Sequence, residues 1–328
     1  MKQVWRALPF FSLAVLALAV GTAHGVSTGS IIGWGQQVVV EPAALDSIIA
    51  IAAGGGYCLG LGSDGKIVAW GGNHYGQCNV PAPNADFIAV AGGVAHSLGL
   101  KNDGTIVAWG YNDYGVCIVP GPNEDFIAVA GGLHHSLGLK SDGTIVAWGL
   151  DNDDQCSVPV PNADFIAVAA GWDHNLGLKS DGTIVAWGDN GSGQCDVPAP
   201  NEGFIAIAAG VYHSLGLKSD GTIVAWGSDG RGECSVPAPN EDFIAVARGP
   251  HHSLGLKSDG TIVAWGLNSD GQCNVAAPNE GFIATAGGGG YSLGLKSDGT
   301  IVAWGANGIS RNIITEPNTG FIAVTGGY

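Results

Sequence analysis

The sequence has 328 residues, of which 46% are hydrophobic, 12% are charged and 56 are glycine. Disordered chains combine low hydrophobicity with high charge, and collagen places glycine at every third position, so the sequence fits neither class. Glycine also disfavours helices, by about 1 kcal/mol per residue relative to alanine. The net charge of −16 opposes a phosphate-binding surface, and with it nucleic acid as a partner. The composition therefore predicts a soluble, mostly β protein.

The first 25 residues have the pattern of a secretory signal peptide. Lys2 and Arg6 precede an apolar run at residues 7–20, and small residues follow at positions 21, 23 and 25. The alternative is an uncleaved membrane anchor, which would need about 20 apolar residues. We therefore expect residues 1–25 to be removed. Residues 26–328 then form one exported domain with no membrane span, either secreted, periplasmic or held at the cell surface.

Beyond this segment the chain repeats itself. The dipeptide Trp-Gly occurs eight times, and after a first interval of 36 residues every interval is 39. Its tryptophans are Trp34, Trp70, Trp109, Trp148, Trp187, Trp226, Trp265 and Trp304. Seven complete units begin at Ile48, Phe87, Phe126, Phe165, Phe204, Phe243 and Phe282. This regular self-similarity predicts a repeat architecture over nearly all of the exported chain.

Each unit contains three short apolar runs separated by turn signals. In the unit that starts at Phe87, residues 87–91, 97–101 and 105–109 predict strands, and Asp103-Gly104 predicts a hairpin turn. The glycine inside the second run is expected to admit a bulky neighbour such as tryptophan. The stretch Gln-Cys-x-Val-Pro is expected to add a short fourth strand. Apolar runs without polar alternation predict sheets that are buried on both faces.

The length of the repeat distinguishes two architectures. Solenoid coils repeat in about 20–30 residues, whereas propeller blades need about 40–50. The period of 39 residues therefore predicts an all-β, seven-bladed β-propeller. Partial units at both ends leave an eighth blade possible. Residues 31–35 would supply its third strand and residues 321–327 its first, with no second strand.

The repeat resembles the regulator-of-chromosome-condensation repeat. The likeness is carried by residues 96–100 (His-Ser-Leu-Gly-Leu), Asp103-Gly104 and Trp109-Gly110, with their equivalents in later units. It is most similar to the compact bacterial forms, which include a secreted β-lactamase-inhibitor propeller. The resemblance implies a seven-bladed ring whose last blade is closed by pairing the two chain ends. It also implies an alternative function, guanine-nucleotide exchange or chromatin binding, which the signal peptide, the acidic charge and the uninterrupted spacing oppose.

Six cysteines form one column of the repeat, and Cys58 stands in a column otherwise held by Ser or Asn. The six are Cys78, Cys117, Cys156, Cys195, Cys234 and Cys273. Equivalent positions in neighbouring blades lie roughly 10 Å apart, beyond the Cα limit of about 7 Å for a disulfide. We therefore expect free thiols that pack as small buried residues at blade junctions. No Cys-x-x-Cys spacing predicts a zinc site.

Five histidines share another column, which Tyr57 and Tyr291 complete. They are His96, His135, His174, His213 and His252. A ring of imidazoles suggests a metal or acid–base centre, but the tyrosines favour a structural role. We expect each side chain to bond the backbone of its own blade.

Other signals of chemistry are weak. The acidic run at residues 151–154 faintly resembles a calcium loop, but it lacks the glycine and distal glutamate of an EF-hand. The sequence contains no nucleophile motif, phosphate loop or carboxylate pair. We therefore predict no catalytic residue, no metal and no cofactor. A secreted enzyme that uses the central channel remains an alternative.

Two stretches vary strongly from unit to unit, one after the first strand and one after Trp-Gly. Because the first and third strands run in the same direction, both stretches should lie on one face, opposite the Asp-Gly turns. Their mixture of aromatic, acidic and basic residues is typical of protein-binding surfaces. The candidate partner-binding residues are Tyr75, Tyr111, Tyr114, Trp172, Asp173, Tyr212, Arg231 and His251. The sequence thus predicts an exported, monomeric, non-catalytic scaffold that binds a protein or a surface glycan, with neutral drift in exposed loops as the competing explanation.

Overall fold

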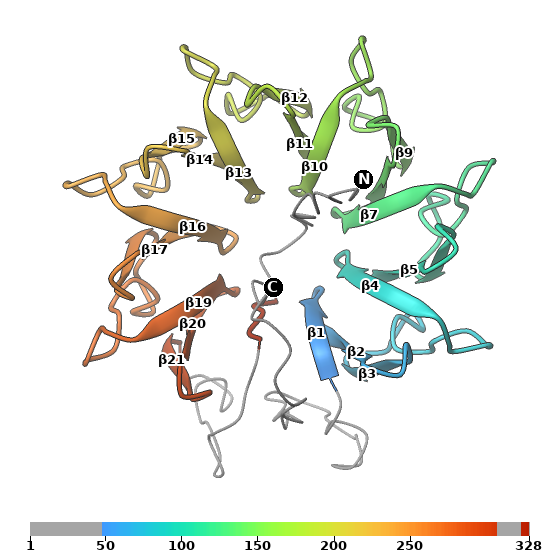
Figure 1. Cartoon of the computed structure of the whole chain (residues 1–328), viewed down its shortest axis with the longest axis horizontal. Coiled ribbons are helices and arrows are strands. Elements are labelled where there is room, and N and C mark those ends of the chain that lie inside the picture. The colour runs from blue at the N-terminus through green and yellow to red at the C-terminus, as the bar shows by residue number, and fades with distance from the viewer. Residues whose placement is uncertain (1–47, 307–322, 328) are drawn as a thin grey trace, which may run out of the picture.

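The computed structural model describes residues 48–306 and 323–327. The regular structure in these residues consists of β-strands, which form seven three-stranded antiparallel sheets. Figure 1 shows the sheets arranged as blades around a central axis, as predicted for a seven-bladed propeller. The described residues contain no helix long and apolar enough to cross a membrane. The signal peptide and residues 31–35 lie outside the described residues.

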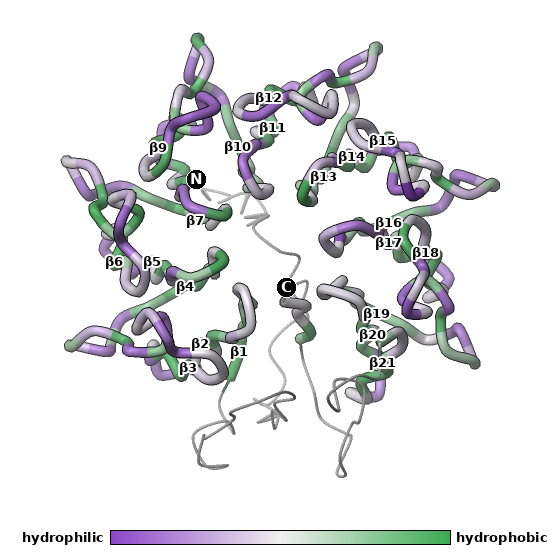
Figure 2. Tube along the Cα trace, turned by 180° about the vertical axis from the view of Figure 1, so that it is seen from behind, coloured by the Kyte–Doolittle hydropathy of each residue, from purple (hydrophilic) through white to green (hydrophobic). Residues whose placement is uncertain are grey.

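Each blade has an inner, a middle and an outer strand. The inner strands are β1 (Ile48–Ala53), β4 (Phe87–Gly92), β7 (Phe126–Gly131), β10 (Phe165–Ala170), β13 (Phe204–Ala209), β16 (Phe243–Arg248) and β19 (Phe282–Gly287). The middle strands are β2 (Tyr57–Gly62), β5 (His96–Lys101), β8 (His135–Lys140), β11 (His174–Lys179), β14 (His213–Lys218), β17 (His252–Lys257) and β20 (Tyr291–Lys296). The outer strands are β3 (Ile67–Gly71), β6 (Ile106–Gly110), β9 (Ile145–Gly149), β12 (Ile184–Gly188), β15 (Ile223–Gly227), β18 (Ile262–Gly266) and β21 (Ile301–Gly305). The same alternation of hydrophobic and hydrophilic segments recurs from blade to blade (Figure 2).

The Asp-Gly turns join the middle and outer strands, as predicted. Gly104 has a φ of +79°, which a residue with a side chain adopts only with strain. One carboxylate oxygen of Asp103 accepts hydrogen bonds from the backbone N (3.0 Å) and the hydroxyl (2.7 Å) of Thr105. These bonds, that to the hydroxyl first, lower the pKa of Asp103. We call the end of the ring that carries these turns the turn face.

The middle strands form the most deeply buried layer, and Leu98 and Leu100 have no exposed surface. Gly99 between them makes room for a bulky neighbour, but that neighbour is phenylalanine and not tryptophan. A Cβ at Gly99 would lie 2.5 Å from the Phe87 ring and 3.1 Å from Ile67 of the preceding blade. The register shift between Phe87 and Ala89 accompanies this approach.

Neighbouring blades are joined by buried hydrogen bonds as well as by apolar packing. The indole N of Trp109 and the hydroxyl of Ser97 both donate to the backbone carbonyl of Gln77 in the preceding blade, at 2.8 Å each. The same tryptophan belongs to the apolar cluster around Leu59, Leu61 and Ile67. Each Trp-Gly corner therefore attaches one blade to the next.

The prediction of a fourth strand was wrong, because each described sheet ends at its outer strand. The edge of β6 is covered by a side chain of the return segment. The amide of Asn123 accepts from the backbone N of Ile106 and donates to its carbonyl oxygen, both at 2.8 Å. A single asparagine thus bonds the edge residue that a fourth strand would have paired. The same pair of bonds recurs at Asn84, Asn162, Asn201, Asn240 and Asn279.

Candidate partner-binding surface

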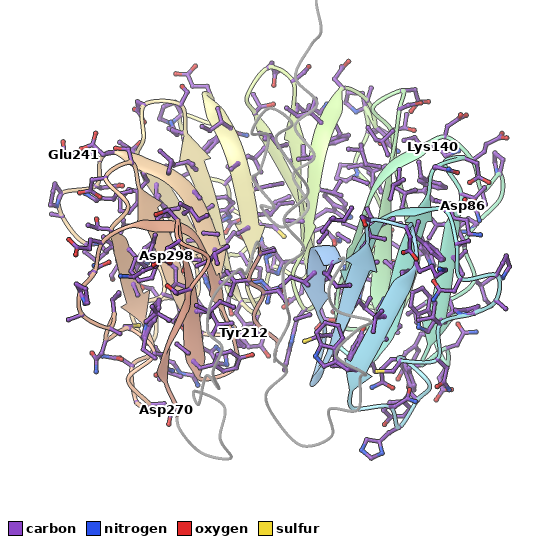
Figure 3. The ribbon with its side chains drawn as sticks, turned by 60° about the horizontal axis from the view of Figure 1, so that its bottom comes forward. Asp86, Lys140, Tyr212, Glu241, Asp270 and Asp298 are labelled. Carbon is purple, nitrogen blue, oxygen red and sulfur yellow. The ribbon has the colours of Figure 1, made fainter. Side chains whose placement is uncertain are left out.

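The two variable stretches of each blade lie side by side at the end of the ring opposite the turn face. In the second blade the backbone N of Tyr111, after β6, donates to the carbonyl of Ala95, after β4, at 3.0 Å. The same bond joins Asp189 to Asp173 and Ser228 to Tyr212, both at 2.8 Å. We call this end the loop face. Figure 3 shows Tyr212 and Asp270 at this lower end, with Asp86, Lys140 and Glu241 at the upper end.

A first aromatic group gathers on the loop face from three successive blades. It consists of Tyr75, Tyr111, Tyr114 and His134. The ring centroids of Tyr75 and Tyr111 are 5.1 Å apart and those of Tyr111 and Tyr114 are 6.0 Å apart, both edge-to-face. His134 lies 5.0 Å from Tyr114. Tyr75 and Tyr114 remain 57% and 44% exposed, so the group offers aromatic surface to solvent.

A second aromatic group, Trp172, Tyr212 and His251, comes from the fourth, fifth and sixth blades. The rings of Trp172 and Tyr212 meet edge-to-face at 6.1 Å, and those of Tyr212 and His251 stack at 6.4 Å. Tyr212 is 38% exposed. The candidate residues therefore form two aromatic groups on one face.

Charged residues surround the second aromatic group. Burial and the nearby Asp153 and Asp189 raise the pKa of half-buried Asp173. Burial lowers the pKa of His251, and the positive charge of Arg231 lowers it further. The buried Glu233 accepts a hydrogen bond from the backbone N of Arg231 (2.9 Å) and lies 3.9 Å from the His251 imidazole.

The histidine column lies beneath the loop face and is structural, as expected, but its partners were predicted wrongly. Each imidazole bonds a side chain of the next blade, not the backbone of its own. His96 Nε2 lies 2.9 Å from the Ser136 hydroxyl, and His135 Nε2 lies 2.7 Å from the side-chain amide oxygen (Oδ1) of Asn175. Burial lowers the pKa of His96 to about 3, so this imidazole is neutral at neutral pH.

Tyrosine serves the same purpose at the first position of this column. The Tyr57 hydroxyl donates to the carbonyls of Gly93 (3.2 Å) and His96 in the next blade. A side chain that spans the junction between two blades is therefore what the column requires. The described His, Cys, Asp and Glu residues form no group of three that could hold a metal ion.

The cysteines are free thiols, as expected, although they are half-buried. The Cys117 thiol donates to the carbonyl of Tyr111 at 3.3 Å, and burial raises its pKa to about 11. Two residues of the acidic run also have structural roles. Asp151 accepts a hydrogen bond from the backbone N of Cys156 (2.8 Å), and Asp154 adopts the positive φ, 59°, that glycine adopts in other blades. The run is therefore a variant of the common loop.

Three features were not predicted from the sequence. His134 completes the first aromatic group. Arg248 lines the central channel, a cavity of about 180 Å³ whose other lining residues are Ala, Val, Ile, Gly and Thr. Its column otherwise holds Gly or Ala, a signal that was readable in the sequence.

The third feature is a ring of half-exposed isoleucines near the turn face. They are Ile49, Ile88, Ile127, Ile166, Ile205, Ile244 and Ile283. Each isoleucine is the second residue of an inner strand, and the inner strands begin at the turn face. Phe126, the first residue of β7, donates its backbone N–H to the carbonyl of Gly104 in an Asp-Gly turn. The invariant Ile at this column was the available signal.

Comparisons with known proteins agree with this architecture. The family model for the regulator of chromosome condensation (RCC1) repeat matches six segments, residues 48–77, 87–116, 126–155, 165–194, 204–233 and 243–272. No curated protein matches the chain.

Several solved propellers have a similar structure. The ectodomain of the Arabidopsis thaliana receptor kinase ACR4 is 26% identical, with a TM-score of 0.62 over 82% of this chain and 98% of that one. The ectodomain of the Physcomitrella patens receptor kinase CR4 is 22% identical, with a TM-score of 0.63 over 79% and 74%. Prp20p of Saccharomyces cerevisiae is 20% identical, with a TM-score of 0.59 over 75% and 82%. The six matched segments cover more than half of the sequence, and the chain belongs to the RCC1-repeat family.

Proposed function

We propose that this protein is an exported, non-catalytic propeller that binds a protein partner through the two aromatic groups of its loop face. The observation that carries the proposal is the exposure of Tyr75, Tyr114 and Tyr212 in groups built from several blades. Exposed aromatic side chains near charged groups are enriched where proteins bind proteins. Drift alone has no reason to bring aromatic residues of successive blades into contact.

Two further observations support export and binding. The first 25 residues have the composition of a signal peptide, and the similar ACR4 and CR4 propellers are receptor ectodomains. A protein of this fold binds proteins elsewhere: Prp20p, the yeast RCC1, was solved with Kap60 bound and was studied for its binding to Gsp1p and histones. Nucleotide exchange or chromatin binding fits this chain less well, because its net charge is −16.

Mutation of one face at a time tests the proposal. The double variant Trp172→Ala, Tyr212→Ala removes two rings of the second group, and Ile88→Ser, Ile127→Ser alters the turn face in the same number of positions. In pull-downs from the native host, we expect the first variant to lose a partner that the wild type and the second variant retain, with affinity reduced at least about 10-fold. Retention of every partner by the first variant would refute the loop-face assignment.

Two separate measurements test the remaining parts. The amino-terminal sequence of the exported protein should begin close to residue 26, and an intact Met1 on a retained protein would refute export. A glycan array probed with the same two variants distinguishes a surface glycan from a protein partner. Binding there that depends on Trp172 and Tyr212 would favour the glycan.

A further inference from the structure

The central channel has apolar walls and carries a single charge. Figure 1 looks along this channel, which the inner strands surround. Its described lining residues come from the last four positions of the inner strands and from residues 324–326, and Arg248 alone among them is charged. The volume is about 180 Å³. An apolar cavity of about 150 Å³ admits a benzene molecule, so the channel has room for a small organic molecule.

Arg248 stands where the other blades have very small residues. It ends β16, so it lies at the loop-face end of the channel. The equivalent positions hold glycine or alanine, namely Ala53, Gly92, Gly131, Ala170, Ala209 and Gly287. A Cβ at Gly287 would lie 2.5 Å from the backbone N of Gly249 and 2.7 Å from the carbonyl carbon of Arg248. A side chain at this position therefore has little room against the preceding blade, and the long side chain of Arg248 extends into the channel.

The buried histidines show where the charge of this side chain acts. Burial lowers the pKa of His213, and the positive charge of Arg248 lowers it further. Burial and a neighbouring histidine lower the pKa of His174 and His252, and the charge of Arg248 again adds to the effect. These histidines belong to the fourth, fifth and sixth blades and are neutral at neutral pH. The charge of Arg248 is therefore felt by three neighbouring blades at the loop-face end of the channel.

We propose that the channel binds a small organic monocarboxylate, with its carboxylate on the Arg248 guanidinium and its apolar body along the alanine and valine walls. A guanidinium matches a carboxylate through two parallel hydrogen bonds. The attraction is stronger among apolar walls than in water, because the local dielectric constant is low. The same walls favour a ligand whose remaining surface is hydrophobic. A phosphate ester fits less well, because it carries nearly two negative charges and the walls offer one positive charge.

This site is separate from the two aromatic groups of the loop face. Arg248 belongs to an inner strand, whereas Tyr75, Tyr114, Trp172 and Tyr212 belong to loops and are not among the described residues that line the channel. Ligand binding in the channel and partner binding on the loop face can therefore be lost one at a time.

Isothermal titration calorimetry with 4-phenylbutyrate tests the site. The wild type should bind with a Kd below about 1 mM, and Arg248→Ala should weaken binding at least about 10-fold. Alanine already stands at this position in the first, fourth and fifth blades, so the variant should fold, and its thermal unfolding checks this. Arg231→Ala removes the same charge from the loop face and should bind like the wild type. Absence of binding by the wild type, or equal binding by Arg248→Ala, overturns the proposal.

Two further probes separate the charge from the apolar body. 4-Phenylbutanamide has the same shape without the charge, and acetate has the charge without the body. Each should bind the wild type at least about 10-fold more weakly than 4-phenylbutyrate does. Equal binding of the amide would show that the charge is not recognised, and equal binding of acetate would show a site for any small anion. Either result overturns the proposal.

The loop-face double variant keeps this test distinct from that of the proposed function. Trp172→Ala, Tyr212→Ala should bind 4-phenylbutyrate with the affinity of the wild type even where it loses its protein partner. A 10-fold loss of 4-phenylbutyrate binding in this variant would place the ligand on the loop face and overturn the assignment to the channel.

Discussion

At the turn face six of the seven blades fill the Asp-Gly turn with the same aspartate, glycine and threonine, whereas at the loop face the blades share backbone hydrogen bonds and differ in their side chains. The pair of hydrogen bonds that Asp103 accepts from Thr105 recurs at Asp142, Asp181, Asp220, Asp259 and Asp298. On the loop face the recurring bond joins two backbone atoms, as from Tyr111 N to Ala95 O. The residues that make it can therefore change without loss of the bond.

This difference explains why variation is confined to one face. A turn whose geometry depends on its aspartate carboxylate accepts only a donor after the glycine, which is threonine in six blades and Lys66, 2.7 Å from Asp64, in the first. A loop held by its own backbone, above buried histidines that join the blades, leaves its exposed side chains free for recognition. The same fold can then present a different surface in each blade.

The largest expected effect is a loss of stability in acid that begins at the loop end of the ring. Burial lowers the pKa of His96, His174 and His213 to about 3 and that of His135 and His252 to about 4. The unfolded histidines titrate near pH 6.5, so between about pH 6.5 and 4 the unfolded chain binds protons that the folded chain does not. Stability is therefore full above pH 6.5 and falls as the pH decreases, by about 5–10 kcal/mol at pH 5. Urea unfolding at several pH values measures it.

The turn face should lose stability only at lower pH. The hydrogen bonds from Thr105 lower the pKa of Asp103, so its stabilising effect is complete above the unfolded pKa of about 3.9 and is lost below it.

The control for the histidine prediction is His96→Tyr, because the chain already has tyrosine in this column at Tyr57. This variant should reduce the loss of stability between pH 6.5 and 4 by about a fifth. A flat profile between pH 7 and 5 would contradict the account of the buried histidines.

The next prediction concerns the asparagine side chains that bond the edge of each outer strand near the turn face. Asn123→Ala removes both bonds to Ile106 and should cost about 2–4 kcal/mol, because it leaves a backbone donor and acceptor poorly satisfied. Asn123→Asp keeps an acceptor but loses the donor, so an intermediate loss is expected. Chemical denaturation gives both values. Equal stability of the alanine variant and the wild type would mean that water replaces the side chain at no cost.

The three strands and the Asp-Gly turn of each blade were predicted correctly, because the signals for them lie in residues that are adjacent in the sequence. The fourth strand was predicted wrongly because the bonds between Asn123 and Ile106 join residues 17 apart, and nothing in the sequence near Asn123 shows that its side chain takes the place of a strand. The partner of His96 was missed for the same reason, since Ser136 lies 40 residues away. Strand direction was enough to place the two variable stretches on one face. The division into two aromatic groups depends on distances between side chains of different blades, and the sequence of a repeat does not give these distances.

A smaller effect tests whether the loop-face backbone is fixed although its side chains vary. Asp154 has a φ of 59° where the second blade has Gly115, with a φ of 74°. Asp154→Gly should therefore stabilise the protein by about 0.5–1 kcal/mol, because glycine adopts this conformation without strain. The reciprocal change, Gly115→Asp, should cost a similar amount. If both changes were neutral in thermal unfolding, the loop backbone would be free to adjust, and the loop face would lack a fixed frame.

The smallest effect is expected at Tyr114, and it decides whether the aromatic groups are structural. Tyr114 is 44% exposed and its contacts are with other loop-face rings, Tyr111 and His134. Tyr114→Ala should therefore change the free energy of unfolding by no more than about 0.5 kcal/mol, as for other exposed positions. Leu98→Ala, in the buried middle strand, should cost about 2–5 kcal/mol in the same denaturation experiment. If Tyr114→Ala approached that cost, the first aromatic group would be part of the packing, and its exposure would no longer support a role in binding.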